Sequence, residues 1–283
     1  MSVAVNRSAS TSGKTTGFFA LERHVRSLER SIDFYVRGLG FTCERHHDEH
    51  ALAADVILTL GQERIALSAV ENAEEVIAQV PGPDVRFQHL AIVTRDMSMA
   101  VQRLQVLAPI PITRGGPQRL PRASGGVTAF KFRDPDGHPL ELIEFATGQC
   151  PDRWRHRAGS DETLGIDHAA ISVSRVEQSI GFYCGLGFSV QTRQVNRGVE
   201  QGRLDGLDEL EDVEVEVVAL VASGPPSVHL ELLAYAKPAA FGQRRDKRAP
   251  SRAADCLTWF GAPSMTCFAD PDGHVNRVIA RPP

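Results

Sequence analysis

The sequence lacks long apolar runs, an excess of either charge and any closely paired cysteines. No apolar stretch approaches the roughly 18 to 20 residues that cross a bilayer. The 31 basic and 35 acidic residues leave a net charge of −4, so the chain has no long-range attraction for polyphosphate. These absences argue against a membrane protein and against nucleic acid as a partner.

The cysteines and the N-terminal segment bear on location. The five cysteines are scattered, odd in number and without a C-x-x-C pair, which is typical of reduced thiols in a cytoplasm. Residues 1–16 are rich in Ser and Thr and lack the apolar core of a secretory signal, so we predict a flexible tail there. The sequence therefore predicts a cytoplasmic protein.

The chain of 283 residues repeats itself, which fits the two domains expected at about 150 residues each. Residues 25–35 (VRSLERSIDFY) return as residues 173–183 (VSRVEQSIGFY), and each copy runs on into Gly-Leu-Gly-Phe. Apolar residues recur at steps of three and four in both copies, which predicts helices with one buried face. A weaker third copy of this helix follows Asp96.

A second repeated element is the turn Asp-Pro-Asp-Gly-His, at residues 134–138 and 270–274. Pro early and Gly late in a turn predict a tight connection between two strands. Strands around these anchors divide the chain into four modules: residues 17–70, 84–146, 164–235 and a reduced copy at 254–281. We predict that His138 and His274 only decorate the turns.

Several of these segments resemble the vicinal-oxygen-chelate superfamily, which includes glyoxalase I, methylmalonyl-CoA epimerase, bleomycin and fosfomycin resistance proteins and extradiol dioxygenases. The resemblance is carried by the two repeated helices and by residues 87–96 (FQHLAIVTRD), 166–173 (IDHAAISV) and 134–142 (DPDGHPLEL). It implies an α+β fold in which tandem βαβββ modules form two cupped mixed sheets, with the fourth module reduced. It also implies an N-terminal domain at 17–146, a linker at 147–163 and a C-terminal domain at 164–283.

The same resemblance implies a site for one divalent metal ion. The family takes one ligand from the first strand and one from the last strand of each module. These positions fall on His89 and Glu141 in module two, and on His168 and Glu231 in module three. Two imidazoles and two carboxylates suit Zn, Ni, Fe, Mn or Co, and the sequence does not choose among these metals.

Modules one and four have lost both ligands. The matching positions hold Ala20 and Ala66 in module one, and Arg277 with Thr258, or less favourably Cys256, in module four. In four-module relatives the sites form between modules two and three and between modules one and four. We therefore expect one intact site and one without metal.

The resemblance implies a glyoxalase-like lyase or isomerase that acts on a small vicinal-oxygen or carbonyl substrate through a metal-stabilised enediolate. A general base must stand beside the carbon that loses its proton. Glu141 and Glu231 are both candidates, and the sequence does not decide between them. His229 shares a strand face with Glu231 and is a further candidate acid or base, with packing at the rim as the alternative.

Two other functions stay open. An extradiol-type Fe(II) dioxygenase uses two histidines and one carboxylate, and here a fourth ligand would take one of its open positions. A non-catalytic binding or drug-resistance protein would need no metal ligands. Glutathione is disfavoured as part of the substrate, because Val93 and Ser172 stand where glyoxalase I relatives carry an arginine.

Two further predictions concern assembly and a histidine cluster. All four modules lie in one chain, so a complete site needs no second subunit and we expect a monomer, with a homodimer as the alternative. The cluster His46-His-Asp-Glu-His50 lies in module one, whose ligand positions are empty. We predict that this cluster is a solvated loop.

Overall fold

The computed structural model describes residues 14–44, 54–70, 79–155, 162–210, 212–242, 255–262 and 265–281. The first strand begins at Lys14, inside the segment predicted as a tail. The cluster at residues 46–50 lies outside the described residues. None of the helices in the described ranges is long and apolar enough to cross a membrane.

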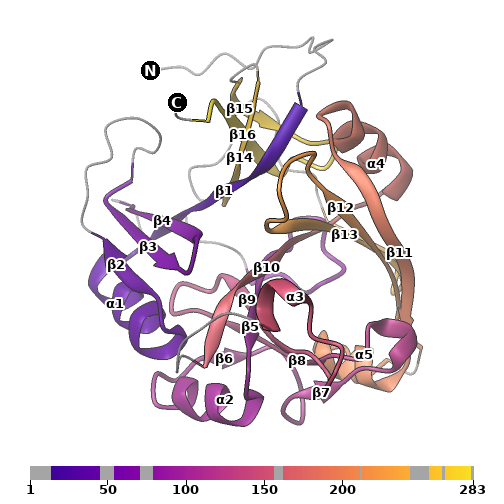
Figure 1. The fold of residues 1–283 in the computed structure, drawn as a ribbon. Coiled ribbons are helices and arrows are strands. Elements are labelled where there is room, and N and C mark those ends of the chain that lie inside the picture. The colour runs from indigo at the N-terminus through magenta and orange to yellow at the C-terminus, as the bar shows by residue number, and fades with distance from the viewer. Residues whose placement is uncertain are drawn as a thin grey trace.

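Modules one and four together form a seven-stranded sheet (Figure 1). Its strands run in the order β15-β16-β14-β1-β4-β3-β2, so the first strand of the chain pairs with a strand near its end. The bounds are β1 Lys14–Val25, β2 Thr42–Glu44, β3 Val56–Leu60, β4 Glu63–Ala69, β14 Cys256–Ala262, β15 Met265–Ala269 and β16 Val275–Ile279.

Modules two and three form the second sheet, in the order β11-β12-β13-β10-β5-β9-β8-β6, with β7 paired to β8. Each sheet therefore takes one module from each half of the chain. The bounds are β5 Gln88–Thr94, β6 Ile110–Pro111, β7 Gln118–Arg119, β8 Thr128–Arg133, β9 Pro139–Glu144, β10 Thr163–Ser172, β11 Ser189–Arg197, β12 Glu214–Val221 and β13 His229–Lys237.

The predicted helices are present, with their apolar faces against a core that includes residues of both sheets. Tyr35, Leu104 and Tyr183 are fully buried there. The α+β fold of βαβββ modules is confirmed, and the part of module four that the structure describes consists of three strands. The helices are α1 Leu28–Asp33 with a π-helical extension Phe34–Gly38, α2 Met97–Gln105, α3 Asp152–Arg155, α4 Val176–Gly185 and α5 Val199–Leu204, with a 3-10 turn at Arg122–Ser124.

The two repeated turns have the predicted geometry. In the first of them Asp134 accepts the backbone N–H of Gly137, which has the positive φ of 95° that glycine tolerates. The prediction that His138 and His274 only decorate the turns is wrong, because both side chains are buried. His138 Nε2 lies 2.9 Å from the carbonyl oxygen of His24, and His274 Nε2 lies 2.9 Å from that of Ser172. Each histidine thus joins its turn to the neighbouring module.

The second aspartate of the first turn also joins two modules. Asp136 is buried and accepts hydrogen bonds from the Arg26 backbone, the Arg30 guanidinium and the Ser31 hydroxyl at the start of α1. Asp272 accepts equivalent bonds from the backbone and hydroxyl of Ser174 ahead of α4. The repeated turn therefore fixes the repeated helix of the preceding module.

We expect Asp136→Ala to lower the free energy of unfolding by about 2 to 4 kcal/mol, because it leaves the buried Ser31 hydroxyl without an acceptor. The matched control is Asp33→Ala, which removes an exposed ion pair with Arg37 and should cost less than about 1 kcal/mol. Urea unfolding measures both. Equal losses in the two variants would contradict the assigned role of Asp136.

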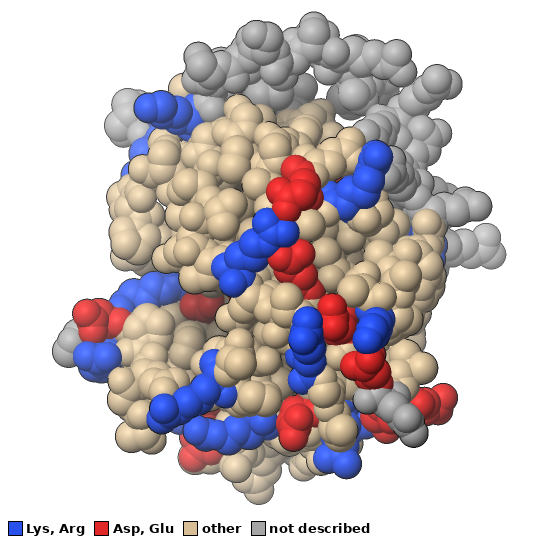
Figure 2. Space-filling view, turned by 90° about the vertical axis from the view of Figure 1, so that its right-hand side faces the viewer, with Lys and Arg blue, Asp and Glu red and all other residues tan. Residues whose placement is uncertain are grey.

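The surface supports the inference drawn from net charge. On the face shown in Figure 2, basic and acidic side chains are interspersed and form no field of one sign. This face therefore provides no continuous basic track for a phosphate backbone.

Candidate metal centre

The predicted ligands lie on four neighbouring strands of the second sheet, β9, β5, β10 and β13. Across these strands, the residue opposite Glu141 is Ala91, and Ala91 in turn lies opposite His168. His89 and Glu231 both lie opposite Ala170. Because side chains alternate along a strand, this register turns all four ligand candidates to the same face of the sheet.

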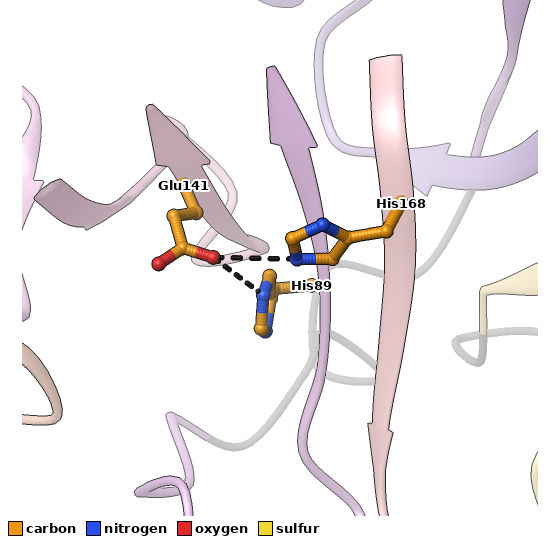
Figure 3. A group of neighbouring side chains, drawn as sticks. All are labelled: His89, Glu141 and His168. Carbon is orange, nitrogen blue, oxygen red and sulfur yellow. Dashed lines mark hydrogen bonds and ion pairs between the residues drawn. The ribbon is translucent and has the colours of Figure 1, made fainter. Parts of the chain in front are cut away.

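Three of the four converge closely. His89 Nε2 lies 3.0 Å from Glu141 Oε2, and His168 Nε2 lies 3.5 Å from the same oxygen (Figure 3). Ligand atoms of these three side chains all lie within 4.8 Å of one another. All three residues are buried.

Glu231 joins this group less tightly. Its Oε2 lies 3.5 Å from His168 Nε2, and its Oε1 lies 3.3 Å from His229 Nε2. The Glu231 side chain is 20% exposed, against 7% for Glu141, so Glu231 is the carboxylate with room to move. His229 lies beside Glu231, as its place on the same strand face predicted.

Asp167 is a member of the site that the sequence reasoning missed. Its Oδ2 lies 3.2 Å from His168 Nδ1, while its Oδ1 accepts hydrogen bonds from Trp154 Nε1 and Arg153 Nη2. This contact leaves His168 Nε2 free to face Glu141 and Glu231. Strand alternation points Asp167 away from His168, but a bulge between Ile166 and His168 breaks the alternation at this residue. The sequence signal that could have identified Asp167 is its place directly before His168, since a carboxylate beside a metal-binding imidazole often orients the imidazole ring.

Lys131 is the second missed residue. It lies on β8 directly opposite Glu141, and its buried Nζ donates a hydrogen bond of 2.7 Å to Asp205 Oδ1. The other oxygen of Asp205 accepts hydrogen bonds from Gln201 and Tyr235. A single lysine on a strand carries no sequence signal for a site, because only the sheet register brings it beside Glu141.

The charges of the site favour a bound cation. Burial raises the pKa of Glu141, but the Lys131 ammonium and the two histidines outweigh burial and hold that pKa well below its usual range. Burial lowers the pKa of His168, but Glu231, Asp167 and Glu141 together raise it to about 10. Without a metal, the cluster thus takes up a proton in its centre.

The residues present fit a divalent metal. Atoms bound to one metal through bonds of about 2.1 Å lie roughly 3.0 to 3.5 Å apart, which matches the separations of Glu141 from His89 and of His168 from Glu141 and Glu231. In addition, His168 Nε2 is a buried nitrogen without a hydrogen-bond partner among the described residues. That nitrogen faces the two carboxylates from which a metal would take its other ligands.

The ligand cluster opens into a cavity of about 610 Å³. Lys131, Asn196, Gln201 and Tyr235 contribute polar groups to its lining. Most of the wall is apolar, with Ile143, Phe145, Leu204, Val215, Val217 and Leu233. This combination of apolar walls and a few convergent polar groups is typical of a small-molecule site.

The first sheet contains the matching cup, which we call the second cup: the face of β1, β4, β14 and β16 that carries Glu22, Cys256 and Arg277. Ala20 lies opposite Thr258 just as His168 lies opposite Ala91, and Cys256 takes the place of His89. The preference for Thr258 as the histidine equivalent is therefore wrong, because the register assigns that position to Cys256.

Comparison with known proteins agrees with this fold. Residues 18–142 match the model of the Glyoxalase/Bleomycin resistance protein/Dioxygenase superfamily. Among solved structures, glyoxalase I from Zea mays superposes with a TM-score of 0.59 at 16% identity, covering 95% of this chain and 93% of that one. A variant of the same enzyme gives 0.60 at 16% identity, with 95% and 94% covered.

A further solved structure, a candidate dioxygenase from Bacillus subtilis subsp. subtilis, gives a TM-score of 0.56 at 13% identity, covering 95% of this chain and 86% of that one. At these identities the likeness concerns the fold alone. No curated protein matches the sequence significantly.

Proposed function

We propose that the protein is a metal-dependent enzyme of the glyoxalase type, a lyase or isomerase of a small vicinal-oxygen or carbonyl substrate. The observation that carries the proposal is the convergence of His89, Glu141, His168 and Glu231 at the wall of an apolar cavity. A buried carboxylate such as Glu141 costs several kcal/mol unless it is paired with a cation.

The side chains of the site would serve as metal ligands and as a general base. His89, Glu141 and His168 would hold the metal with Glu231 as a more loosely held fourth ligand, and Asp167 would keep His168 in the correct orientation. When bound, a divalent metal supplies a Lewis acid for the charge that develops as a proton leaves the carbon beside a carbonyl. Glu231 would take that proton, because it is the more exposed and less tightly held carboxylate. His229, 3.3 Å from Glu231, would share the proton with it.

The cavity supports a substrate with an apolar body and one pair of adjacent oxygens. Val93 and Ser172, which replace the arginine expected for glutathione, are both buried. A glutathione carboxylate would find no cation at either position. All four ligand candidates come from one chain, so we keep the monomer as the expected state.

The test combines metal content with binding of a small hydroxamate, a chelator with two adjacent oxygens. We expect about one Zn, Ni, Mn, Fe or Co per chain in protein purified without chelators. We also expect acetohydroxamate to shift the visible spectrum of the Co(II)-loaded protein. If metal-free protein still bound acetohydroxamate, that result would favour a binding protein over an enzyme.

A second candidate, an Fe(II) dioxygenase, is favoured by one observation: the tightest group is two histidines and one carboxylate, His89, His168 and Glu141. Glu231→Ala separates the two functions. Loss of most of the metal indicates a four-ligand site and supports the lyase or isomerase. Full retention of iron, together with oxygen consumption on a catechol, supports the dioxygenase.

A further inference from the structure

The second cup carries a different set of reactive groups in place of metal ligands. By register, Cys256 stands at the position of His89, Glu22 at that of Ala170 and Arg277 at that of Glu141. A second cysteine, Cys267 on β15, packs in the same cluster as Cys256. The second cup therefore contains two thiols, a carboxylate and a guanidinium where the first site has its candidate metal ligands.

The guanidinium connects these groups. Arg277 Nη2 donates to Cys267 Sγ across 3.2 Å, and Arg277 Nη1 lies 2.9 Å from Glu22 Oε1. Glu22 also accepts a hydrogen bond from the Thr258 hydroxyl. Because a fixed cation occupies the position of a ligand, the second cup disfavours a metal and favours a negatively charged sulfur.

We propose that Cys267 is a nucleophilic thiolate that small hydroperoxides oxidise to a sulfenic acid. Cys267 is only half-buried, and its sulfur lies against Arg277, so it is both reachable and stabilised as an anion. Cys256 is buried and serves as a hydrogen-bond donor to Cys267 rather than as the attacking group. This reactivity is independent of the function proposed for the first site.

The chemical step balances with the hydroperoxide as oxidant. The Cys267 sulfur attacks the terminal oxygen, so an S–O bond forms as the O–O bond breaks. The sulfur loses two electrons, and the peroxide is reduced to an alkoxide, or to hydroxide from hydrogen peroxide, which takes a proton from water.

The electrostatics agree with this geometry. The hydrogen bond from Cys256 and the contact with Arg277 lower the pKa of Cys267, although burial opposes them. Burial raises the pKa of the nearby Glu22, while Thr258 and Arg277 oppose that rise. A thiol with a lowered pKa stays ionised as the pH falls, so Cys267 should remain reactive in mild acid where ordinary thiols are not.

The test is alkylation of the full-length folded protein with iodoacetamide between pH 6 and pH 8.5, followed by peptide mass spectrometry. The labelling of an ordinary thiol rises roughly a hundred-fold over this range. We expect the rate at Cys267 to change less than three-fold, with the exposed Cys43 and Cys184 as internal references. After treatment with hydrogen peroxide, a dimedone adduct should form at Cys267 at least ten-fold faster than at the references.

The matched variants are Arg277→Met and Arg277→Lys. Arg277→Met should slow labelling of Cys267 at pH 6 at least ten-fold, and Arg277→Lys should retain part of the rate because it keeps the charge. The wild-type profile decides the question without the variants. Labelling of Cys267 that rises with pH in parallel with Cys43 and Cys184, or that is absent throughout, would overturn the proposal.

Discussion

Protein carrying Glu141→Gln is expected to contain less than a tenth of the metal found in the wild-type protein. Glu141 Oε2 lies within 3.5 Å of both ligand histidines, so it is the oxygen that joins His89 and His168 into one site. Glutamine keeps the shape but removes the charge that neutralises a divalent cation. We expect the affinity for metal to fall more than a hundred-fold, measured by competition with a chromophoric chelator.

The control is Glu29→Gln, which removes a carboxylate from the exposed surface of α1 and should leave metal content unchanged. Both variants should show the far-ultraviolet circular dichroism of the wild type. A Glu141→Gln protein that kept one metal per chain would refute the site. It would leave the match of residues 18–142 to the superfamily model untouched.

The second large effect concerns Lys131. Lys131→Met leaves the Asp205 carboxylate buried without its cation, so the free energy of unfolding should fall by about 3 to 5 kcal/mol. We also expect at least ten-fold weaker binding of acetohydroxamate to the Co(II) protein, because the ammonium lines the cavity opposite Glu141 and supplies positive charge to an anionic ligand. Urea unfolding and spectral titration measure the two effects separately.

The double variant Lys131→Met/Asp205→Asn separates stability from binding. It removes both charges of the pair, and the asparagine oxygen still accepts from Tyr235 and Gln201. Stability should therefore recover in large part, while hydroxamate binding stays weak. Recovery of both would show that Lys131 serves only to balance Asp205.

Local sequence patterns determined the elements of this fold. The repeated helices and the Asp-Pro-Asp-Gly turns depend on side-chain periodicity and on the backbone preferences of Pro and Gly, and both act within a few residues. The same repeats aligned the modules, and the resemblance to the vicinal-oxygen-chelate superfamily then implied that His89, Glu141, His168 and Glu231 belong together. Their convergence in the structure agrees with that prediction, and the metal itself awaits the experiments above.

Only the tertiary structure decided which other residues join them. Asp167 reaches His168 because a bulge turns one residue out of the alternation, and Lys131 reaches the site because β8 pairs with β9. Cys256 replaces a histidine, and Arg277 approaches Cys267, through the pairing of strands from module four. Register and bulges depend on contacts between segments far apart in the chain, so no local pattern in the sequence encodes them.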